Sequence, residues 1–361
     1  MRKIHLISLF LFIFVTCSYG SIFVPFNQKE VSYMGRVEKV ENQYAKIYWP
    51  GTSVTINFKG TELKAVLKNG KEETYFYAIV DGNEKEAKKV KADTVQSSIL
   101  LATGLKNTNH SVQLFKLSNN TSYTDFYGFE LVDGSTVLNP APLPKRKIEF
   151  YGNSITAGHG VDVLPGQDDS GSPEYFNNYW TYAALTSRHF NAQYSCISRS
   201  GIGVMVSWFP IIMPEMYDRL NPEDPTSKWN FSKYTPDIVV INLFQNDMWL
   251  TASPTHPEFK ARFGTTPPDV PTIILSYQNF VKSIRAKYPD ATIICVLGSM
   301  NATEKGSPWP GYIEKAVDGL SDSKILTHFF PYKNTPGHPK VAEQKVMADD
   351  LIGFIEKNIK W

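Results

Sequence analysis

The 361-residue sequence has only three cysteines, and no Cys/His spacing in it resembles a zinc site. Cys17 lies in the N-terminal segment, whereas Cys196 and Cys295 lie in apolar runs that are typical of buried strands. A disulfide between these two is permitted outside the cytosol, but two buried thiols are the expected state. The sequence therefore predicts no disulfide framework and no metal, and no motif in it indicates a cofactor.

An excess of charge of either sign is also absent. The chain has 37 Lys and Arg residues against 35 Asp and Glu residues, a formal net charge of +2. Removal of Arg2 and Lys3 with an N-terminal signal would leave 35 residues of each sign. Nucleic acid is therefore not an expected partner, because nucleic-acid binders carry a strong basic excess. The 42% hydrophobic and 13% aromatic content excludes a disordered chain.

Long hydrophobic runs are absent beyond the N-terminus. Two basic residues precede the apolar stretch 4–15, and small residues at positions 18 and 20 come before Ser21. This is the pattern of a secretory signal peptide over residues 1–20, and the apolar stretch is shorter than the roughly 20 residues that span a bilayer. A retained membrane anchor and a lipoprotein acylated at Cys17 are the alternatives. We expect a secreted or periplasmic protein with no stable membrane insertion after signal removal.

Residues 21–138 show the alternation of antiparallel strands and no helical periodicity. Apolar and polar residues alternate over 54–58, 63–67 and 112–114, and Asp-Gly or Asn-Gly turns separate several of the runs. Strands at roughly ten-residue spacing are typical of a sandwich. The sequence predicts an all-β, jelly-roll-like sandwich domain.

A proline-rich linker, residues 139–144, separates this region from a different pattern over residues 145–361. Three prolines in five residues make a stiff, extended spacer. After it, short apolar strands such as 148–151 and 238–244 alternate with helical stretches such as 273–284. Strands that alternate with helices predict an α/β domain with a doubly wound parallel sheet.

Four residues at predicted strand ends or beside the last helix of this domain are candidates for chemistry. Ser154 lies in a glycine-flanked turn directly after a strand, where backbone N–H groups are near. Gly201 would let a backbone N–H approach a ligand, and Asn246 can donate to an oxyanion. His338 lies on a proline-flanked turn and can take a proton from serine at neutral pH. Taken alone, each also fits an ordinary turn, cap or loop residue.

The chain order Ser, Gly, Asn, His resembles that of the SGNH (GDSL-like) hydrolases. Gly152-Asn153-Ser154-Ile155 is similar to their Gly-Asp-Ser block with Asn for Asp, and Phe244 replaces the glycine of their Gly-x-Asn-Asp block. The β-sandwich, residues 126–131 and the proline linker further resemble carbohydrate esterase family 2. So do three stretches of the second domain, residues 147–156, 213–218 and 236–243.

This resemblance implies a serine carboxylic ester hydrolase that removes acetyl groups from plant cell-wall polysaccharides such as xylan and glucomannan. Ser154 would attack the acetyl carbonyl while His338 takes its proton, and an acetyl-serine would form. The Ser154 N–H, the Gly201 N–H and the Asn246 side chain would hold the oxyanion. The partner is then an acetylated polysaccharide or oligosaccharide. The alternatives are another SGNH esterase or lipase and a carbohydrate-binding protein whose hydrolase domain has decayed.

The carboxylate that orients the histidine in this superfamily is missing from its usual places, since Thr335 and Pro336 stand three and two residues before His338. We therefore expect a Ser–His dyad in which a backbone carbonyl within 335–337 accepts the His338 Nδ1–H. The alternative is an acid from the loop after the nucleophile. Its candidates are Asp162, Asp168, Asp169 and Glu174.

Aromatic residues near these motifs are candidates for stacking on sugar rings. Trp208 follows the Gly201 motif and Trp249 follows the Asn246 motif, and core packing fits each of them equally well. Phe244 either narrows the acyl pocket or packs in the core. The sandwich either binds glycan or serves as a scaffold for the second domain.

Overall fold

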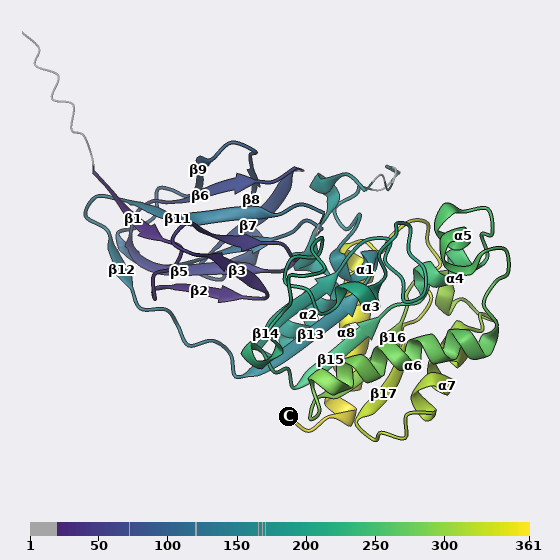
Figure 1. The fold of residues 1–361 in the computed structure, drawn as a ribbon. Coiled ribbons are helices and arrows are strands. Elements are labelled where there is room, and N and C mark those ends of the chain that lie inside the picture. Colours follow the sequence, from purple (N-terminus) through teal and green to yellow (C-terminus); the bar gives the residue numbers. More distant parts are fainter. Residues whose placement is uncertain (1–19, 72, 120, 165, 168, 170) are drawn as a thin grey trace, which may run out of the picture.

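The computed structural model describes residues 20–361 apart from positions 72, 120, 165, 168 and 170. The predicted signal peptide and Cys17 therefore lie outside the described residues, except for Gly20. Two domains follow one another along the described chain (Figure 1). None of the helices in this part of the chain is long and apolar enough to cross a membrane.

The first domain is a β-sandwich, as the alternating pattern predicts. Its strands are β1 (Ser21–Pro25), β2 (Val31–Met34), β3 (Val37–Val40), β4 (Tyr44–Ile47), β5 (Ser53–Gly60), β6 (Leu63–Asn69), β7 (Thr74–Val80), β8 (Lys88–Ala92), β9 (Ser97–Ala102), β10 (Thr108–Lys116), β11 (Thr124–Val132) and β12 (Thr136–Leu138). They form two six-stranded antiparallel sheets, β3-β4-β11-β6-β9 with β1 beside β11, and β12-β5-β10-β7-β8 with β2 beside β5. Alternate residues such as Ile56, Leu67 and Phe129 are fully buried in the core of the sandwich.

The second domain alternates strands with helices around one parallel sheet. Its elements are β13 (Arg146–Gly152), α1 (Ser154–Ala157), α2 (Tyr182–His189), β14 (Ala192–Ser198), α3 (Met213–Met216), β15 (Ile238–Asn242), α4 (Gln245–Thr251), α5 (Pro257–Phe263), α6 (Val270–Lys287), β16 (Thr292–Leu297), α7 (Trp309–Asp318), β17 (Ile325–Phe329) and α8 (Val341–Asn358). The five strands run in the order β14-β13-β15-β16-β17.

Helices cover both faces of this sheet, which confirms the doubly wound prediction. Phe280 of α6 and Ile313 of α7 pack on one face, and Ala183 of α2 and Leu351 of α8 pack on the other. Numbered along this domain, the strand order is 2-1-3-4-5. The second strand is therefore added on one side of the first strand, β13, and the later strands on its other side, which makes a topological switch point between β13 and β15. Ligands bind outside the carboxyl ends of the strands at such a point, which is where β13 leads into Ser154.

Two cysteines and one strand end show how closely the sequence pattern matched the fold. Cys196 and Cys295 are both buried free thiols, as expected. The apolar run 238–244 ends as a strand at Asn242. Phe244 has a left-handed φ of 82°, which stops the strand and starts α4. Hydrophobicity alone could not locate that turn, because Phe244 is as apolar as the strand before it.

A buried arginine and a tryptophan connect the two domains. Arg36, in the turn between β2 and β3, is 1% exposed and donates from Nη1 to the Tyr217 carbonyl at 2.6 Å. Its Nη2 lies 3.4 Å from the Glu149 carboxylate of β13. The indole N–H of Trp49 donates to the Leu220 carbonyl at 2.8 Å. The sandwich is therefore docked on the second domain by specific polar contacts.

Candidate active site

Ser154 is the first residue of α1 and directly follows the end of β13. The Asn153 side chain caps this short helix by accepting the Ile155 N–H at 3.0 Å. A Cβ on Gly152 would lie 2.0 Å from the Thr156 hydroxyl oxygen, so only glycine lets the helix begin this close to the strand. Asn153 serves here as a helix cap, and its amide oxygen accepts as a carboxylate oxygen would.

The structure brings Ser154 and His338 together, although 184 positions separate them. Ser154 Oγ lies 2.9 Å from His338 Nε2. On the other side of the ring, His338 Nδ1 lies 2.5 Å from Asp169 Oδ2, which also accepts the His338 backbone N–H at 2.7 Å. The expected dyad with a backbone carbonyl from 335–337 is therefore wrong, because the loop after the nucleophile carries a carboxylate to His338.

Of the other candidate acids, the two that the structure describes do not occupy this position. Asp162 pairs with Lys89 of the sandwich at 2.8 Å, and Glu174 is exposed. Asp168 lies outside the described residues. Sequence spacing could not choose among these acids, because the path of the loop decides which carboxylate meets the histidine.

Charge and burial oppose one another at this cluster. Burial alone would raise the pKa of Asp169, but the close approach of His159 and His338 holds that pKa well below its usual range. Burial lowers the pKa of His338 below its ordinary value of 6.5, and the Asp169 carboxylate opposes that shift. Asp169 is then an anion and His338 a neutral base at neutral pH, which are the states that proton transfer from Ser154 requires.

His159 is a neighbour of the pair that sequence reasoning missed. Its ring stacks on His338 with centroids 4.1 Å apart, and its Nε2 lies 3.3 Å from Asp169 Oδ1. Its Nδ1 lies 3.3 Å from the Ser200 hydroxyl. Its place five residues after Ser154 belongs to no motif, so only its position near the nucleophile could have indicated it.

Three of these side chains are also spaced as metal ligands can be. Donor atoms of His159, Asp169 and His338 all lie within 4.8 Å of one another. Asp169 Oδ2 and His338 Nδ1 already share a hydrogen bond, however, and His338 Nε2 faces Ser154. The cluster therefore fits a proton-transfer array.

Gly201 and Asn246 lie in adjoining segments that follow β14 and β15, the two strands on either side of β13. The loop that holds Gly201 packs on the end of β13, where the Arg199 N–H donates to the Gly152 carbonyl at 3.3 Å. Gly201 has a left-handed φ of 83°, a conformation that favours glycine. The Asn246 amide donates to the Ile202 carbonyl at 2.8 Å, which uses one of the two N–H groups of this amide.

Asp247 holds the turn that follows Gly201, a role that sequence reasoning did not assign. This carboxylate is fully buried and accepts the backbone N–H groups of Val204 at 2.9 Å, Met205 at 2.6 Å and Val206 at 3.3 Å. Burial raises the pKa of Asp247 to about 6, and these three donors oppose that shift. Its signal in the sequence was its place directly after Asn246.

Phe244 packs in the core and does not shape an acyl pocket. It is fully buried, with ring centroids 4.7 Å from Tyr277 and 5.0 Å from Trp309. Of its two interpretations from sequence, the structure supports core packing. The left-handed φ also suits the glycine that stands at this position in the Gly-x-Asn-Asp block of the SGNH hydrolases that the sequence resembles.

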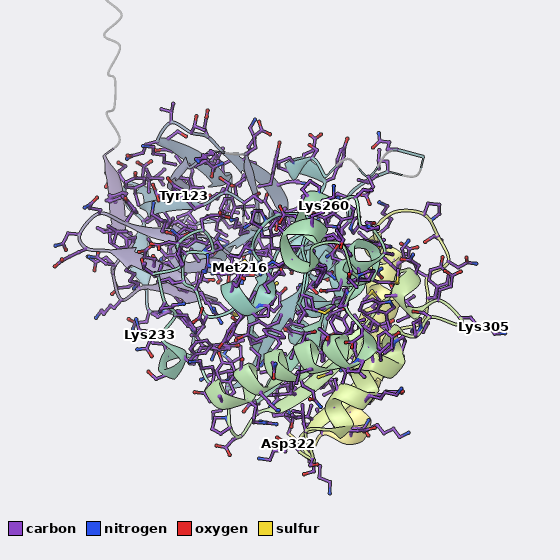
Figure 2. The ribbon with its side chains drawn as sticks, turned by 45° about the vertical axis from the view of Figure 1, so that its right-hand side comes forward. Tyr123, Met216, Lys233, Lys260, Lys305 and Asp322 are labelled. Carbon is purple, nitrogen blue, oxygen red and sulfur yellow. The ribbon has the colours of Figure 1, made fainter. Side chains whose placement is uncertain are left out.

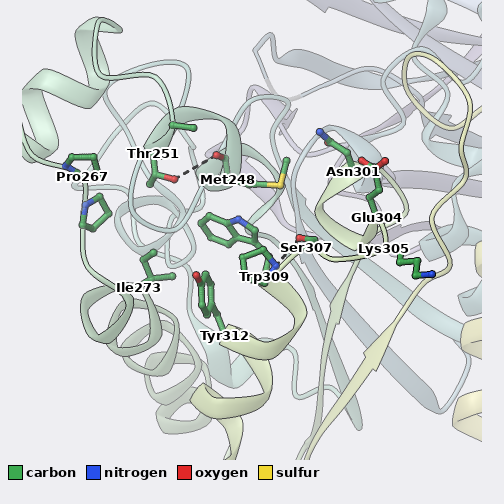
Figure 3. Close-up of a pocket in the computed structure, with 13 residues that line it drawn as sticks. Met248, Thr251, Pro267, Ile273, Asn301, Glu304, Lys305, Ser307, Trp309 and Tyr312 are labelled. Carbon is green, nitrogen blue, oxygen red and sulfur yellow. Dashed lines mark hydrogen bonds between the residues drawn. The ribbon is translucent and has the colours of Figure 1, made fainter.

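The two candidate tryptophans differ in exposure and in their partners. Trp208 is 49% exposed, and its indole N–H donates to Asn246 Oδ1 at 3.1 Å. Trp249 is partly buried, and its indole N–H donates to Asn301 Oδ1 at 3.1 Å. Asn301 also lines a hollow of about 500 Å³ beside α4 and α7, with Trp309 among its walls (Figure 3). Trp208 is therefore bonded to the predicted oxyanion donor Asn246, whereas Trp249 is bonded to Asn301, a residue that lines this hollow.

The 2-1-3-4-5 sheet and the serine–histidine–aspartate array define the class of protein. Residues 150–323 match the GDSL-like Lipase/Acylhydrolase family. Residues 33–142 match a second family, Carbohydrate esterase 2 N-terminal. The chain belongs to carbohydrate esterase family 2.

Solved structures and curated relatives agree with this assignment. A family two carbohydrate esterase from Clostridium thermocellum, solved with cellohexaose, is 31% identical with a TM-score of 0.80 over 91% of this chain and 98% of that chain. The cellulase/esterase CelE of Acetivibrio thermocellus is 32% identical over 92% of this chain, which spans 40% of that protein's length. An acetylxylan esterase / glucomannan deacetylase of Cellvibrio japonicus is 24% identical over 92% of this chain and 89% of the relative.

Proposed function

We propose that this chain is a carbohydrate O-acetylesterase that removes acetyl groups from plant cell-wall polysaccharides, xylan or glucomannan, through an acetyl-serine intermediate. The observation that carries the proposal is the hydrogen-bonded array of Ser154, His338 and Asp169 in a member of carbohydrate esterase family 2. Relatives named acetylxylan esterase / glucomannan deacetylase support the substrate class.

The array supports acyl transfer in two steps. Ser154 Oγ attacks the acetyl carbonyl while His338 Nε2 takes its proton, and Asp169 stabilises the imidazolium that forms. His338 then returns the proton to the leaving sugar hydroxyl. In the second step His338 takes a proton from water as the water oxygen attacks the acetyl carbon of the acetyl-serine. The bond from that carbon to Ser154 Oγ then breaks, His338 returns the proton to Ser154 Oγ, and acetate leaves.

Three donors are proposed to hold the oxyanion: the Ser154 N–H, the Gly201 N–H and the Asn246 side chain. Two hydrogen bonds orient the Asn246 side chain for this role: its oxygen accepts the Trp208 indole N–H, and its amide donates to the Ile202 carbonyl. Loss of one such donor costs roughly 10²–10³ in turnover. Trp208 and Trp249 are the proposed sugar contacts; Trp208 is the more exposed of the two and is bonded to the proposed oxyanion donor Asn246.

Release of acetate from acetylated xylan and acetylated glucomannan tests this function. We expect wild type to release acetate and Ser154→Ala to release almost none, whereas Ser283→Ala on α6 retains full activity. Preference for long-chain esters would instead support the lipase alternative. Binding of the polysaccharide without acetate release would support a decayed hydrolase. Wild-type activity in Ser154→Ala would contradict the mechanism itself.

Secretion is part of the proposal and rests on the N-terminal pattern of residues 1–20. A secreted or periplasmic location suits an enzyme whose polymer substrate lies outside the cell. Expression of the full chain in a bacterial host, followed by N-terminal sequencing of the exported protein, tests it. A mature chain that begins at Ser21 is the expected result, and a chain acylated at Cys17 or retained uncut would contradict it.

A further inference from the structure

Three hollows share lining residues in succession, and the first two lie between the sandwich and the second domain. The first, of about 240 Å³, shares Thr121 and Ser122 with the second, of about 340 Å³. The second shares Arg199 and Glu223 with the third, of about 380 Å³. Because neighbouring hollows have walls in common, they form one elongated depression, which we call the junction groove.

One end of the junction groove adjoins the reacting groups. His159 and Ser200 line the first hollow. His159 stacks on the face of His338 with centroids 4.1 Å apart, and Ser200 directly precedes Gly201. A ligand in the first hollow would therefore contact His159, whose ring stacks on His338, and Ser200, the residue next to a proposed oxyanion donor.

The sandwich supplies one side of the first two hollows, whereas residues of the second domain alone line the third. The segment between β10 and β11 contributes Ser118, Asn119, Thr121 and Ser122 to the first hollow. Asn119 Oδ1 accepts the Ser200 N–H at 3.3 Å, so this segment is held directly against the loop that carries Gly201. Farther along, Tyr123 lines the second hollow and lies on the sandwich side of the junction in Figure 2.

The walls of the groove combine aromatic rings with polar groups of both charges. Phe176 lines the first hollow, Tyr123 the second and Phe209 the third. The Arg199 guanidinium lies 4.1 Å from the centre of the Phe209 ring and donates to Glu223 at 2.6 Å. Sugar rings present apolar C–H faces and polar edges, which such a surface matches. A long acyl chain would instead require a continuous apolar trough.

We propose that the junction groove binds the polysaccharide backbone that flanks the acetylated sugar, with the β-sandwich as one wall. This inference rests on the proposed esterase function, and it assigns the sandwich a direct part in substrate binding. The reacting sugar lies at the His159 end, and neighbouring units extend past Thr121 toward Arg199 and Phe209.

The sharpest test places a bulky side chain where two hollows meet. Thr121 is exposed and lines both the first and the second hollow. We expect Thr121→Arg to lower kcat/KM for acetylated xylohexaose at least ten-fold more than for 4-nitrophenyl acetate, mainly through KM. The loss should grow with oligosaccharide length, because longer chains occupy more of the groove.

A matched control carries the same change far from the groove. Thr136 is exposed on β12 and pairs with Lys59, near the end of β5 that points away from the second domain. Thr136→Arg should match wild type on both substrates and in thermal unfolding. Suppose that Thr121→Arg folds like wild type and lowers kcat/KM equally for both substrates, or for neither. The groove then does not bind the backbone.

A binding measurement separates this inference from the proposed function. Titration of Ser154→Ala with xylohexaose and with cellohexaose should give an affinity that the added Thr121→Arg change weakens at least ten-fold. If wild type cleaves no acetyl ester but this loss of binding is seen, the esterase proposal fails and the groove stands. If wild type is an esterase and Thr121→Arg binds both hexaoses as tightly as its parent, the groove proposal fails alone.

Discussion

Asp169 is the residue on which the proposed rate depends most strongly after Ser154 and His338. It accepts both the His338 Nδ1–H and the His338 backbone N–H, so it fixes the tautomer and the position of the ring. Asp169→Asn preserves the shape but can present an N–H where an acceptor is needed. By analogy with serine hydrolases, kcat should fall by about 10²–10⁴. Steady-state assays with an acetyl ester measure the loss.

Asp162→Asn is the matched control for this change. Asp162 lies in the same loop but pairs with Lys89 on the sandwich. We expect its substitution to leave kcat near that of wild type. Equal losses in both variants would mean that the loop, and not the carboxylate on His338, limits the reaction.

The pH dependence of kcat/KM should report His338. His338 must be neutral to accept a proton, so activity falls as pH drops through its pKa, which burial places below 6.5. The Asp169 carboxylate raises the pKa of His338, so Asp169→Asn should move the acid limb to lower pH as well as lower the plateau. The His159 ring lowers the pKa of His338, so His159→Gln should move the limb to higher pH. Identical limbs in all three proteins would contradict this assignment.

Phe244 shows two opposing effects at one residue, and their sizes predict which one dominates. Its left-handed backbone costs about 1–2 kcal/mol for a residue other than glycine. Loss of a fully buried phenylalanine ring costs about 3–5 kcal/mol. Phe244→Gly should therefore lower the free energy of unfolding by about 1–4 kcal/mol in urea titrations. Asn191→Gly, at an exposed left-handed position, should change it little; a stabilised Phe244→Gly would show that backbone strain dominates.

The site residues differ in how far the sequence could reveal them. Ser154, Gly201, Asn246 and His338 occur in a recognisable order, and the structure places Ser154 and His338 in hydrogen-bonding distance. Asp169 was one of four open candidates, because a loop of irregular backbone has no periodicity that fixes which side chain points inward. His159 and Asp247 act through packing and backbone contacts that no spacing rule encodes.

At the level of elements, regular patterns were reliable and short connections were not. The repeat over 273–284 corresponds to α6, and the alternation over 54–58 corresponds to β5. These patterns are long, and their period reflects one buried face. The one-turn α1 has four residues, too few for a period to show, and depends on the Asn153 cap and the close approach at Gly152.

The contact between α4 and the turn after Gly201 gives a prediction about elements. Asp247, in the first helical turn of α4, accepts three backbone N–H groups from the turn after Gly201. Asp247→Ala leaves these buried donors without a partner, at a cost of about 1–3 kcal/mol for each unsatisfied group. We expect reduced stability in urea and a lower kcat with little change in KM, because the Gly201 N–H loses its position.

Asp224→Ala is a suitable control for that change. Asp224 also caps a turn by accepting a backbone N–H, that of Thr226, but it is only partly buried, so water can replace the lost acceptor. Its substitution should leave kcat unchanged. A normal kcat in Asp247→Ala would show that the turn keeps its shape without the carboxylate.

The whole molecule joins a parallel sheet that presents the reacting groups to a sandwich that borders them. The strand order of the sheet places Ser154 at the topological switch point, where successive strands begin to be added on the other side of β13. Both domains were expected from the change of period near residue 140, since each pattern is local. Their relative position was not, because it depends on contacts such as Asn119 with Ser200 that join residues 81 positions apart.

Arg36 allows the coupling between the domains to be measured. It lies fully buried near Glu149, which also accepts hydrogen bonds from the hydroxyls of Ser195 at 2.7 Å and Tyr288 at 2.8 Å. Removal of one partner of a buried ion pair lowers the free energy of unfolding by about 3–5 kcal/mol, because the remaining charge stays unpaired in surroundings of low dielectric constant. Arg36→Met should therefore lower the urea midpoint and speed proteolysis in the 139–144 linker.

The double variant Arg36→Met with Glu149→Gln tests the cause of that loss. If the uncompensated Glu149 charge is responsible, neutralising it should restore part of the stability, so that the two substitutions together cost less than Arg36→Met alone. If the loss instead arises from the Arg36 hydrogen bonds to the Tyr217 and Arg219 carbonyls, the double variant should be no more stable than Arg36→Met.

The junction groove needs both walls in place. Arg36→Met should therefore lower the affinity for xylohexaose by a larger factor than it lowers kcat/KM for 4-nitrophenyl acetate. Wild-type stability and proteolysis in Arg36→Met would mean that the remaining contacts, including Trp49 with Leu220, suffice to dock the domains.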